Sequence, residues 1–74
     1  MRKVKRDRRF MDKMLEQQKL NGMTYARLAQ RLRAKGHDVT NLQLFGIASR
    51  IREADKQLQN DIASILGCTR RDIF

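Results

Sequence analysis

The stretch MTYARLAQRLRAKGHDVTNLQLFGIASRI, residues 23–51, has the pattern of two helices joined by a short turn. In each half, apolar residues recur at the three- and four-residue spacing of one helix face. Thr24 and Thr40 precede the two halves, and threonine is a favoured N-cap because its hydroxyl accepts a hydrogen bond from the first helical turn. Gly36 lies between them, and glycine commonly ends a helix. We therefore predict one helix from Thr24 to Gly36 and a second that begins at Asp38 or Thr40.

Each of these two helices has a predicted buried face. The first helix would bury Tyr25, Leu28, Ala29 and Leu32. The second would bury Leu44, Ile47, Ala48 and Ile51. No Gly or Pro interrupts residues 47–66, so we place the break before the next helix near residues 54–55, with Asp55 as the new N-cap.

Helices are also predicted on both sides of this stretch. Residues 8–20 carry an apolar stripe of Phe10, Met11, Met14 and Leu15, and the dipeptide NG at 21–22 ends this helix. Beyond residue 55, a second stripe consists of Leu58, Ile62, Ile65 and Leu66. We expect the methionines and all four aromatic rings to fill the core. The resulting prediction is an all-α fold, a compact four- to five-helix bundle.

The segment LQNDIASILGCTRRDIF, residues 58–74, allows two interpretations. Its helix, glycine and second helix match the spacing of a DNA-binding helix-turn-helix. The same letters also describe a core helix that stops at Gly67, followed by a Thr69–Asp72 capping box and a final turn that packs Ile73 and Phe74 on the core. Only five residues follow Thr69, whereas a recognition helix needs more than one turn to reach base edges. We favour the second interpretation and leave the first as an alternative.

Charge is the strongest compositional signal. Seventeen Lys and Arg against eight Asp and Glu give a net charge of +9 on 74 residues, which favours binding to a polyanion, above all nucleic acid. Residues 1–9 carry +5 of this charge and residues 10–74 carry +4. We therefore divide the chain into a basic arm at 1–9, expected to be flexible, and a DNA-binding domain at 10–74.

Several classes of function have no support in the sequence. The single cysteine, Cys68, and the single histidine, His37, lie far apart, so no zinc site is expected, and we predict no metal or other cofactor. No catalytic triad, paired carboxylates or phosphate-binding glycine loop is present, so we predict that the protein is not an enzyme and binds no small molecule. No apolar run approaches 18 residues. We expect a cytoplasmic, nucleoid-associated protein without membrane contact.

Residues 10–74 resemble the lambda-repressor-like family, which includes phage Cro and CI repressors and XRE-type regulators. The resemblance rests on MTYARLAQRL, DVTNLQLFGIASRI and IASILGCTRRDIF. It implies a bundle of about five helices in which the second and third form the helix-turn-helix. It also implies a transcriptional regulator of phage or mobile-element type, acting as a repressor by occupying operator DNA. Such proteins often bind as homodimers to two half-sites.

The predicted DNA contacts follow from the side chains. Asn and Gln can pair with adenine and Arg with guanine, whereas a helix N-terminus and unpaired Arg favour phosphate. In the helix-turn-helix, the candidate residues are Thr24, Tyr25, Arg27, Arg31, Thr40, Asn41, Leu42, Gln43, Gly46 and Arg50. In the basic arm, they are Arg2, Lys3, Lys5, Arg6, Arg8 and Arg9. The alternatives are a protein-interaction module, such as an antitoxin or a phage factor that binds a host protein, and a sequence-blind RNA or nucleoid binder.

Overall fold

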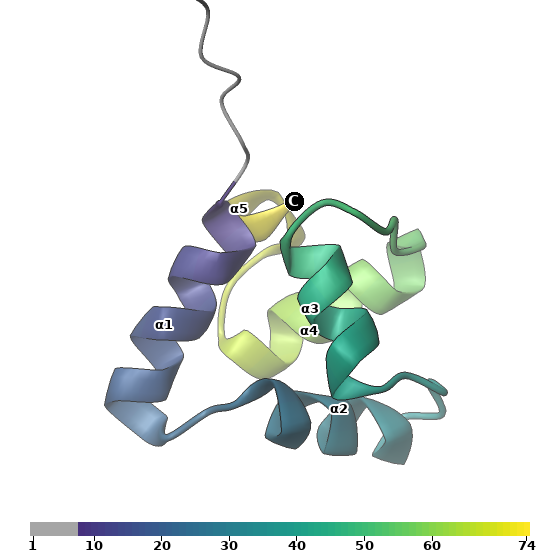
Figure 1. Cartoon of the computed structure of the whole chain (residues 1–74), viewed down its shortest axis with the longest axis horizontal. Helices are drawn as coiled ribbons and strands as arrows, with labels where there is room; N and C mark the ends of the chain where they lie inside the picture. Colours follow the sequence, from purple (N-terminus) through teal and green to yellow (C-terminus); the bar gives the residue numbers. More distant parts are fainter. Residues whose placement is uncertain (1–7) are drawn as a thin grey trace, which may run out of the picture.

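The computed structural model describes residues 8–74, which form helices and no strand (Figure 1). The helices are α1 (Arg9–Asn21), α2 (Tyr25–Ala34), α3 (Asn41–Ala48), α4 (Lys56–Leu66) and α5 (Arg70–Ile73). In Figure 1, α1 stands on one side, α2 crosses the base, α3 lies in front of α4, and α5 returns to the start of α1. The prediction of a small all-α bundle is confirmed.

The starts of the helices, and the ends of α1 and α4, lie where the local sequence predicts. α2, α3 and α4 each begin after a side-chain oxygen that accepts a backbone N–H from the first turn, namely those of Thr24, Thr40 and Asp55. The capping box of Thr69 and Asp72 starts α5, and its hydrogen bonds lower the pKa of the Asp72 carboxyl. α1 and α4 end at Gly22 and Gly67, which have left-handed φ angles of 67° and 75°.

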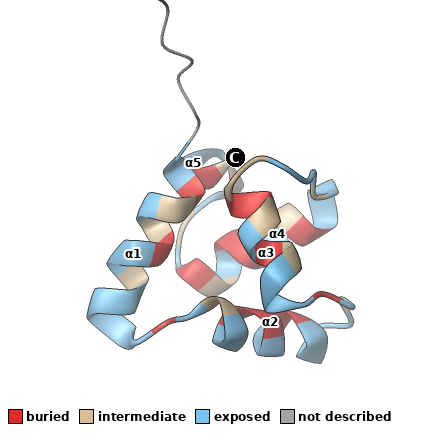
Figure 2. Cartoon of the chain, viewed as in Figure 1, coloured by how far each residue is buried: buried red, intermediate tan, exposed pale blue. Residues whose placement is uncertain are grey.

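All five helices contribute to one core (Figure 2). Phe10, Leu28, Leu44, Ile62 and Ile73, one from each helix, are at most 1% exposed. The amphipathic stripes therefore meet in the interior of the bundle, as expected for helices whose apolar faces must be buried against one another. Three expected members do not join them, because Leu15 is 50% exposed, Phe45 is 46% exposed and Ile51 is 78% exposed.

The end of α3 differs from the prediction. The helix stops at Ala48 rather than near residues 54–55, and Arg50 adopts a positive φ of 62°. The amides of Ile51 and Arg52 both bond to the carbonyl of Gly46, so the chain turns back on the helix. Ile51 was expected on the inner face of this helix, but it lies beyond the helix and is 78% exposed. Glycine is therefore not required for this helix end.

The segment after Gly67 closes the core, as the favoured interpretation predicts. Ile73 is 1% exposed, and the ring of Phe74 meets that of Phe10 edge-on with centroids 5.4 Å apart. The Arg9 guanidinium donates to the carbonyls of Arg71 (3.0 Å) and Phe74 (2.7 Å). The single turn of α5 is thus held at both of its sides by α1 and the core.

Candidate functional site

The turn between α2 and α3 is held by contacts on three sides. Val39 is 9% exposed and packs into the core. The Arg33 guanidinium donates to the Val39 carbonyl at 3.0 Å, which connects the end of α2 to the start of α3. His37 Nε2 donates to Asp61 Oδ2 at 2.5 Å, which connects the turn to α4. These contacts fix the position of α3 across α2, as a helix-turn-helix requires.

The His37–Asp61 pair was not expected from the sequence, in which His37 was considered as a metal ligand. Both side chains are mostly buried, with 17% and 20% of their surface exposed. Gln57 adds a second hydrogen bond to the same carboxylate oxygen at 3.3 Å. The hydrogen bond with His37 is the main reason that the pKa of Asp61 lies below its usual value, with smaller contributions from Gln57 and the charge of Lys35.

The outer side of α2 is exposed (Figure 2) and carries basic residues. Thr24, Arg27 and Arg31 are exposed on it, and α2 contains no acidic residue. The Thr24 hydroxyl accepts the Arg27 amide at 3.1 Å, so the side chain caps the helix while remaining exposed. Three of the predicted phosphate-contacting residues therefore share one surface at the start and middle of α2.

The exposed face of α3 consists of Asn41, Leu42 and Phe45. Their spacing of three and four residues places them on one stripe of the helix. Gln43 is only partly exposed, and its side-chain oxygen accepts the Thr40 amide at 3.0 Å in a complete capping box. The predicted role of Gln43 in base recognition therefore competes with its role at the helix start.

Gly46 lies in α3 close to the side chain of Arg52. A Cβ built on Gly46 would be 3.2 Å from both Cγ and Cδ of Arg52. From the sequence, close backbone approach to DNA or to another helix, or a helix kink, would account for this glycine. Within the described residues, the nearest neighbour of this position is the flexible side chain of Arg52, in the segment that follows α3.

Three predicted DNA contacts lie elsewhere in the fold. Arg50 lies beyond α3, donates through Nη2 to the Ile73 carbonyl, and places its guanidinium 5.2 Å from the centroid of the Phe74 ring. Arg9 belongs to α1 and bonds to the carbonyl of Arg71 in α5 and to that of Phe74 after it. Arg8 is exposed and pairs with Asp12 at 3.9 Å. Arg2, Lys3, Lys5 and Arg6 lie outside the described residues.

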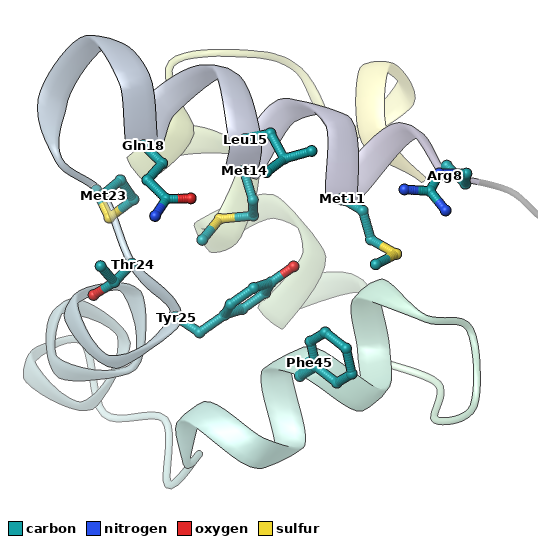
Figure 3. Close-up of a pocket in the computed structure, with 9 residues that line it drawn as sticks. All are labelled: Arg8, Met11, Met14, Leu15, Gln18, Met23, Thr24, Tyr25 and Phe45. Atoms are coloured by element: carbon teal, nitrogen blue, oxygen red, sulfur yellow. The ribbon is translucent and has the colours of Figure 1, made fainter.

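An apolar groove of about 330 Å³ lies between α1 and α3 (Figure 3). The groove is lined mainly by Met11, Met14, Leu15, Met23, Tyr25 and Phe45. The Tyr25 and Phe45 rings meet edge-on with centroids 5.6 Å apart, and burial raises the pKa of the Tyr25 hydroxyl. The groove was missed because all four aromatic rings, including that of Phe45, were expected in the core.

Comparison of the chain with models of known protein families, with curated proteins and with solved structures gives no significant match. Two physical features complete the description of residues 8–74. None of these helices is long and apolar enough to cross a membrane. No group of three or more His, Cys, Asp and Glu side chains in this part of the chain could hold a metal ion.

Proposed function

We propose that the protein is a sequence-specific DNA-binding regulator of the lambda-repressor-like class, with α2 and α3 as its helix-turn-helix. The observation that carries the proposal is the fixed placement of α3 across α2. One helix of the pair exposes Asn41 and Leu42, and the other exposes Arg27 and Arg31, while Arg33 and His37 hold the turn between them. The five-helix bundle agrees with the fold that the resemblance implies.

The proposed complex places α3 in the major groove. Residues near the start of a recognition helix contact base edges, so Asn41 would pair with adenine through its amide. Thr24, Arg27 and Arg31 would contact phosphates beside the groove. The basic residues at 2–6 would add affinity that is independent of sequence. We further propose that two copies bind two half-sites, repress by occupying the operator, and reside with the nucleoid in the cytoplasm.

Selection of bound duplexes from a random DNA pool tests this proposal. A palindromic consensus with half-sites about 34–36 Å apart is expected for a homodimer. The affinity should fall steeply with salt, with a log–log slope near −5 for about six phosphate contacts. Binding that is salt-sensitive but shows no sequence preference would contradict the operator function and favour an RNA or nucleoid binder.

The groove between α1 and α3 favours a second candidate, a protein-interaction module. Apolar residues line most of it, and Leu15 and Phe45 on its walls are each about half exposed at 50% and 46%. Exposed apolar clusters of this kind often mark protein interfaces. This candidate predicts that the protein binds no duplex DNA at low salt, which is the result that separates it from the first.

A further inference from the structure

The exposed stripe of α3 is unusually apolar for a surface helix. Leu42 is 77% exposed and Phe45 is 46% exposed, although both belong to residue types that fill cores. α3 contains no charged residue between Asn41 and Ala48. The one polar side chain on this stripe is that of Asn41. A partner of α3 must therefore offer apolar groups beside a group that binds an amide.

The stripe is also held in place before any partner arrives. The capping box of Thr40 and Gln43 fixes the start of the helix one residue before Asn41. The ring of Phe45 is supported at its edge by Tyr25, whose centroid is 5.6 Å away. Leu42 precedes Phe45 by three residues, so both side chains point from the same side of a rigid helix. Little ordering is needed for this surface to bind.

In the major groove, the apolar group that distinguishes one base pair from another is the C5-methyl of thymine. Three helical residues span about 4.5 Å along the axis, which is close to the 3.4 Å rise between successive bases. We propose that Leu42 and Phe45 recognise the methyl groups of thymines at neighbouring base pairs, with Asn41 on an adjacent adenine. This inference rests on the proposed function and adds the chemistry of the recognised bases.

The test uses the intact chain and the duplex recovered by selection, synthesised once with thymine and once with uracil. Uracil pairs as thymine does but lacks the methyl group. We expect about a fourfold loss of affinity for each contacted methyl, from about 0.8 kcal/mol per buried carbon and 1.4 kcal/mol per tenfold. Two methyls in a half-site give a loss of more than tenfold. A scrambled duplex in both forms supplies the background.

Two variants locate the effect on α3. Leu42→Ala should bind the thymine duplex more weakly and reduce the thymine-to-uracil ratio to the fourfold that Phe45 contributes. Leu20→Ala is the matched control, because it removes a leucine that is 69% exposed at the end of α1. It should retain the full ratio. Because Leu42 is almost fully outside the core, its truncation should leave the thermal midpoint unchanged.

The possible results distinguish a failure of the proposed methyl contacts from a failure of the proposed regulator function. Sequence-specific binding with equal affinity for the two duplexes would overturn the methyl contacts and leave the regulator function standing. An equal thymine-to-uracil ratio for Leu42→Ala and the unaltered chain would overturn the assignment to Leu42. No preference for any duplex, or binding to single strands through the exposed Phe45 ring, would overturn both proposals.

Discussion

α3 and α5 begin in the same way and serve different purposes. Each starts with a threonine capping box, Thr40 with Gln43 in one case and Thr69 with Asp72 in the other. α5 is a single turn whose Ile73 is 1% exposed. α3 has eight residues, and its Leu42 is 77% exposed. A capping motif therefore fixes where a helix begins, but not whether its surface faces the core or a partner.

The difference arises from the contacts that follow each cap. Around α5, guanidinium groups of Arg9 and Arg50 bind the carbonyls of Arg71, Ile73 and Phe74, so the segment is held against α1 and the core. Around α3, the corresponding contacts lie at its ends, and the middle of its outer face stays open. Loss of α5 should therefore affect stability, and changes on the outer face of α3 should affect binding.

Truncation after Cys68 should have the largest effect, because it removes Ile73 and Phe74 from the core. Loss of one large buried side chain costs about 2–5 kcal/mol, which is comparable with the stability of a domain this small. We expect the truncated chain to lose its cooperative thermal transition in circular dichroism. Arg71→Ala, which alters an exposed side chain of the same helix, should melt as the intact chain does. A cooperative melt of the truncated chain would refute the role of α5 in the core.

Asn41→Ala and Gln43→Ala should separate recognition from helix capping within α3. Asn41 is exposed, and loss of a bidentate contact to adenine costs about 1–3 kcal/mol of discrimination at one base pair. Gln43 accepts the Thr40 amide, so its truncation should lower stability by about 0.5–1 kcal/mol. Competition binding against single-base variants and thermal melts measure the two effects. Equal loss of discrimination in both variants would contradict this division.

Arg50→Ala and Arg27→Ala compare a structural arginine with one on the α2 surface. Arg50 bonds to the Ile73 carbonyl and contacts the Phe74 ring, so its removal should lower stability by about 1.5 kcal/mol. Arg27 is exposed, so its removal should leave the melt unchanged, weaken all duplexes alike and reduce the salt slope by about 1. If Arg50→Ala changes base preference without a change in melting, our structural assignment of Arg50 is wrong.

The helix starts and the core of this protein could be predicted because their causes are local. Thr24, Thr40 and Asp55 bond to amides within three residues, and stripes such as Leu28 and Leu32 follow the helical period. The end of α3 could not be predicted in this way. Its positive φ occurs at Arg50, whose guanidinium is bound by a carbonyl 23 residues away.

The features of the candidate site also fall into two groups, those that the sequence predicts and those that it does not. The exposure of Thr24, Arg27 and Asn41 agrees with the sequence expectation, because polar residues opposite an apolar stripe face solvent. The groove beside Phe45 was not expected, because the periodicity identifies the buried face of Leu44, Ile47 and Ala48 but Phe45, as an aromatic residue, was expected in the core. The pair of His37 and Asp61 joins residues 24 positions apart, and neither has a local sequence signal.

Gly67→Ala and Gly46→Ala compare the stability contributions of two glycines, one at the end of α4 and one within α3. Gly67 ends α4 with φ of 75° and has open space around it, so alanine suffers only the backbone strain, about 1 kcal/mol. That strain lowers the melting temperature by about 4–8 °C. Gly46 is helical, and its added methyl meets only the flexible side chain of Arg52. The melting temperature of Gly46→Ala should therefore equal that of the intact chain. If it falls as far as that of Gly67→Ala, the Arg52 side chain cannot move away from the added methyl group.

Asp61→Asn should have the smallest effect, and it tests the contact that holds the turn before α3. Hydrogen bonding with His37 lowers the pKa of Asp61 in the folded chain below the ordinary value near 3.9. A lowered folded pKa stabilises the protein above that ordinary value, and the contribution disappears as pH falls through the lowered pKa. The variant should thus melt below the intact chain at pH 7, by less than Gly67→Ala does, and the gap should close on acidification below pH 4.

Asp38→Asn is the matched control for this comparison, because Asp38 lies in the same turn but is exposed. Its melting temperature should remain parallel to that of the intact chain from pH 7 to pH 3. The groups that face the pair are Lys35, whose charge lowers the Asp61 pKa, and Gln57, whose amide donates to the same oxygen. Neither of them titrates in this range, and below pH 4 only carboxyl groups do, so a gap that closes there reports the ionisation of Asp61. A gap that is independent of pH would show that the charge of Asp61 does not stabilise the turn, and no gap at any pH would show that Val39 packing and the Arg33 hydrogen bond hold it without Asp61.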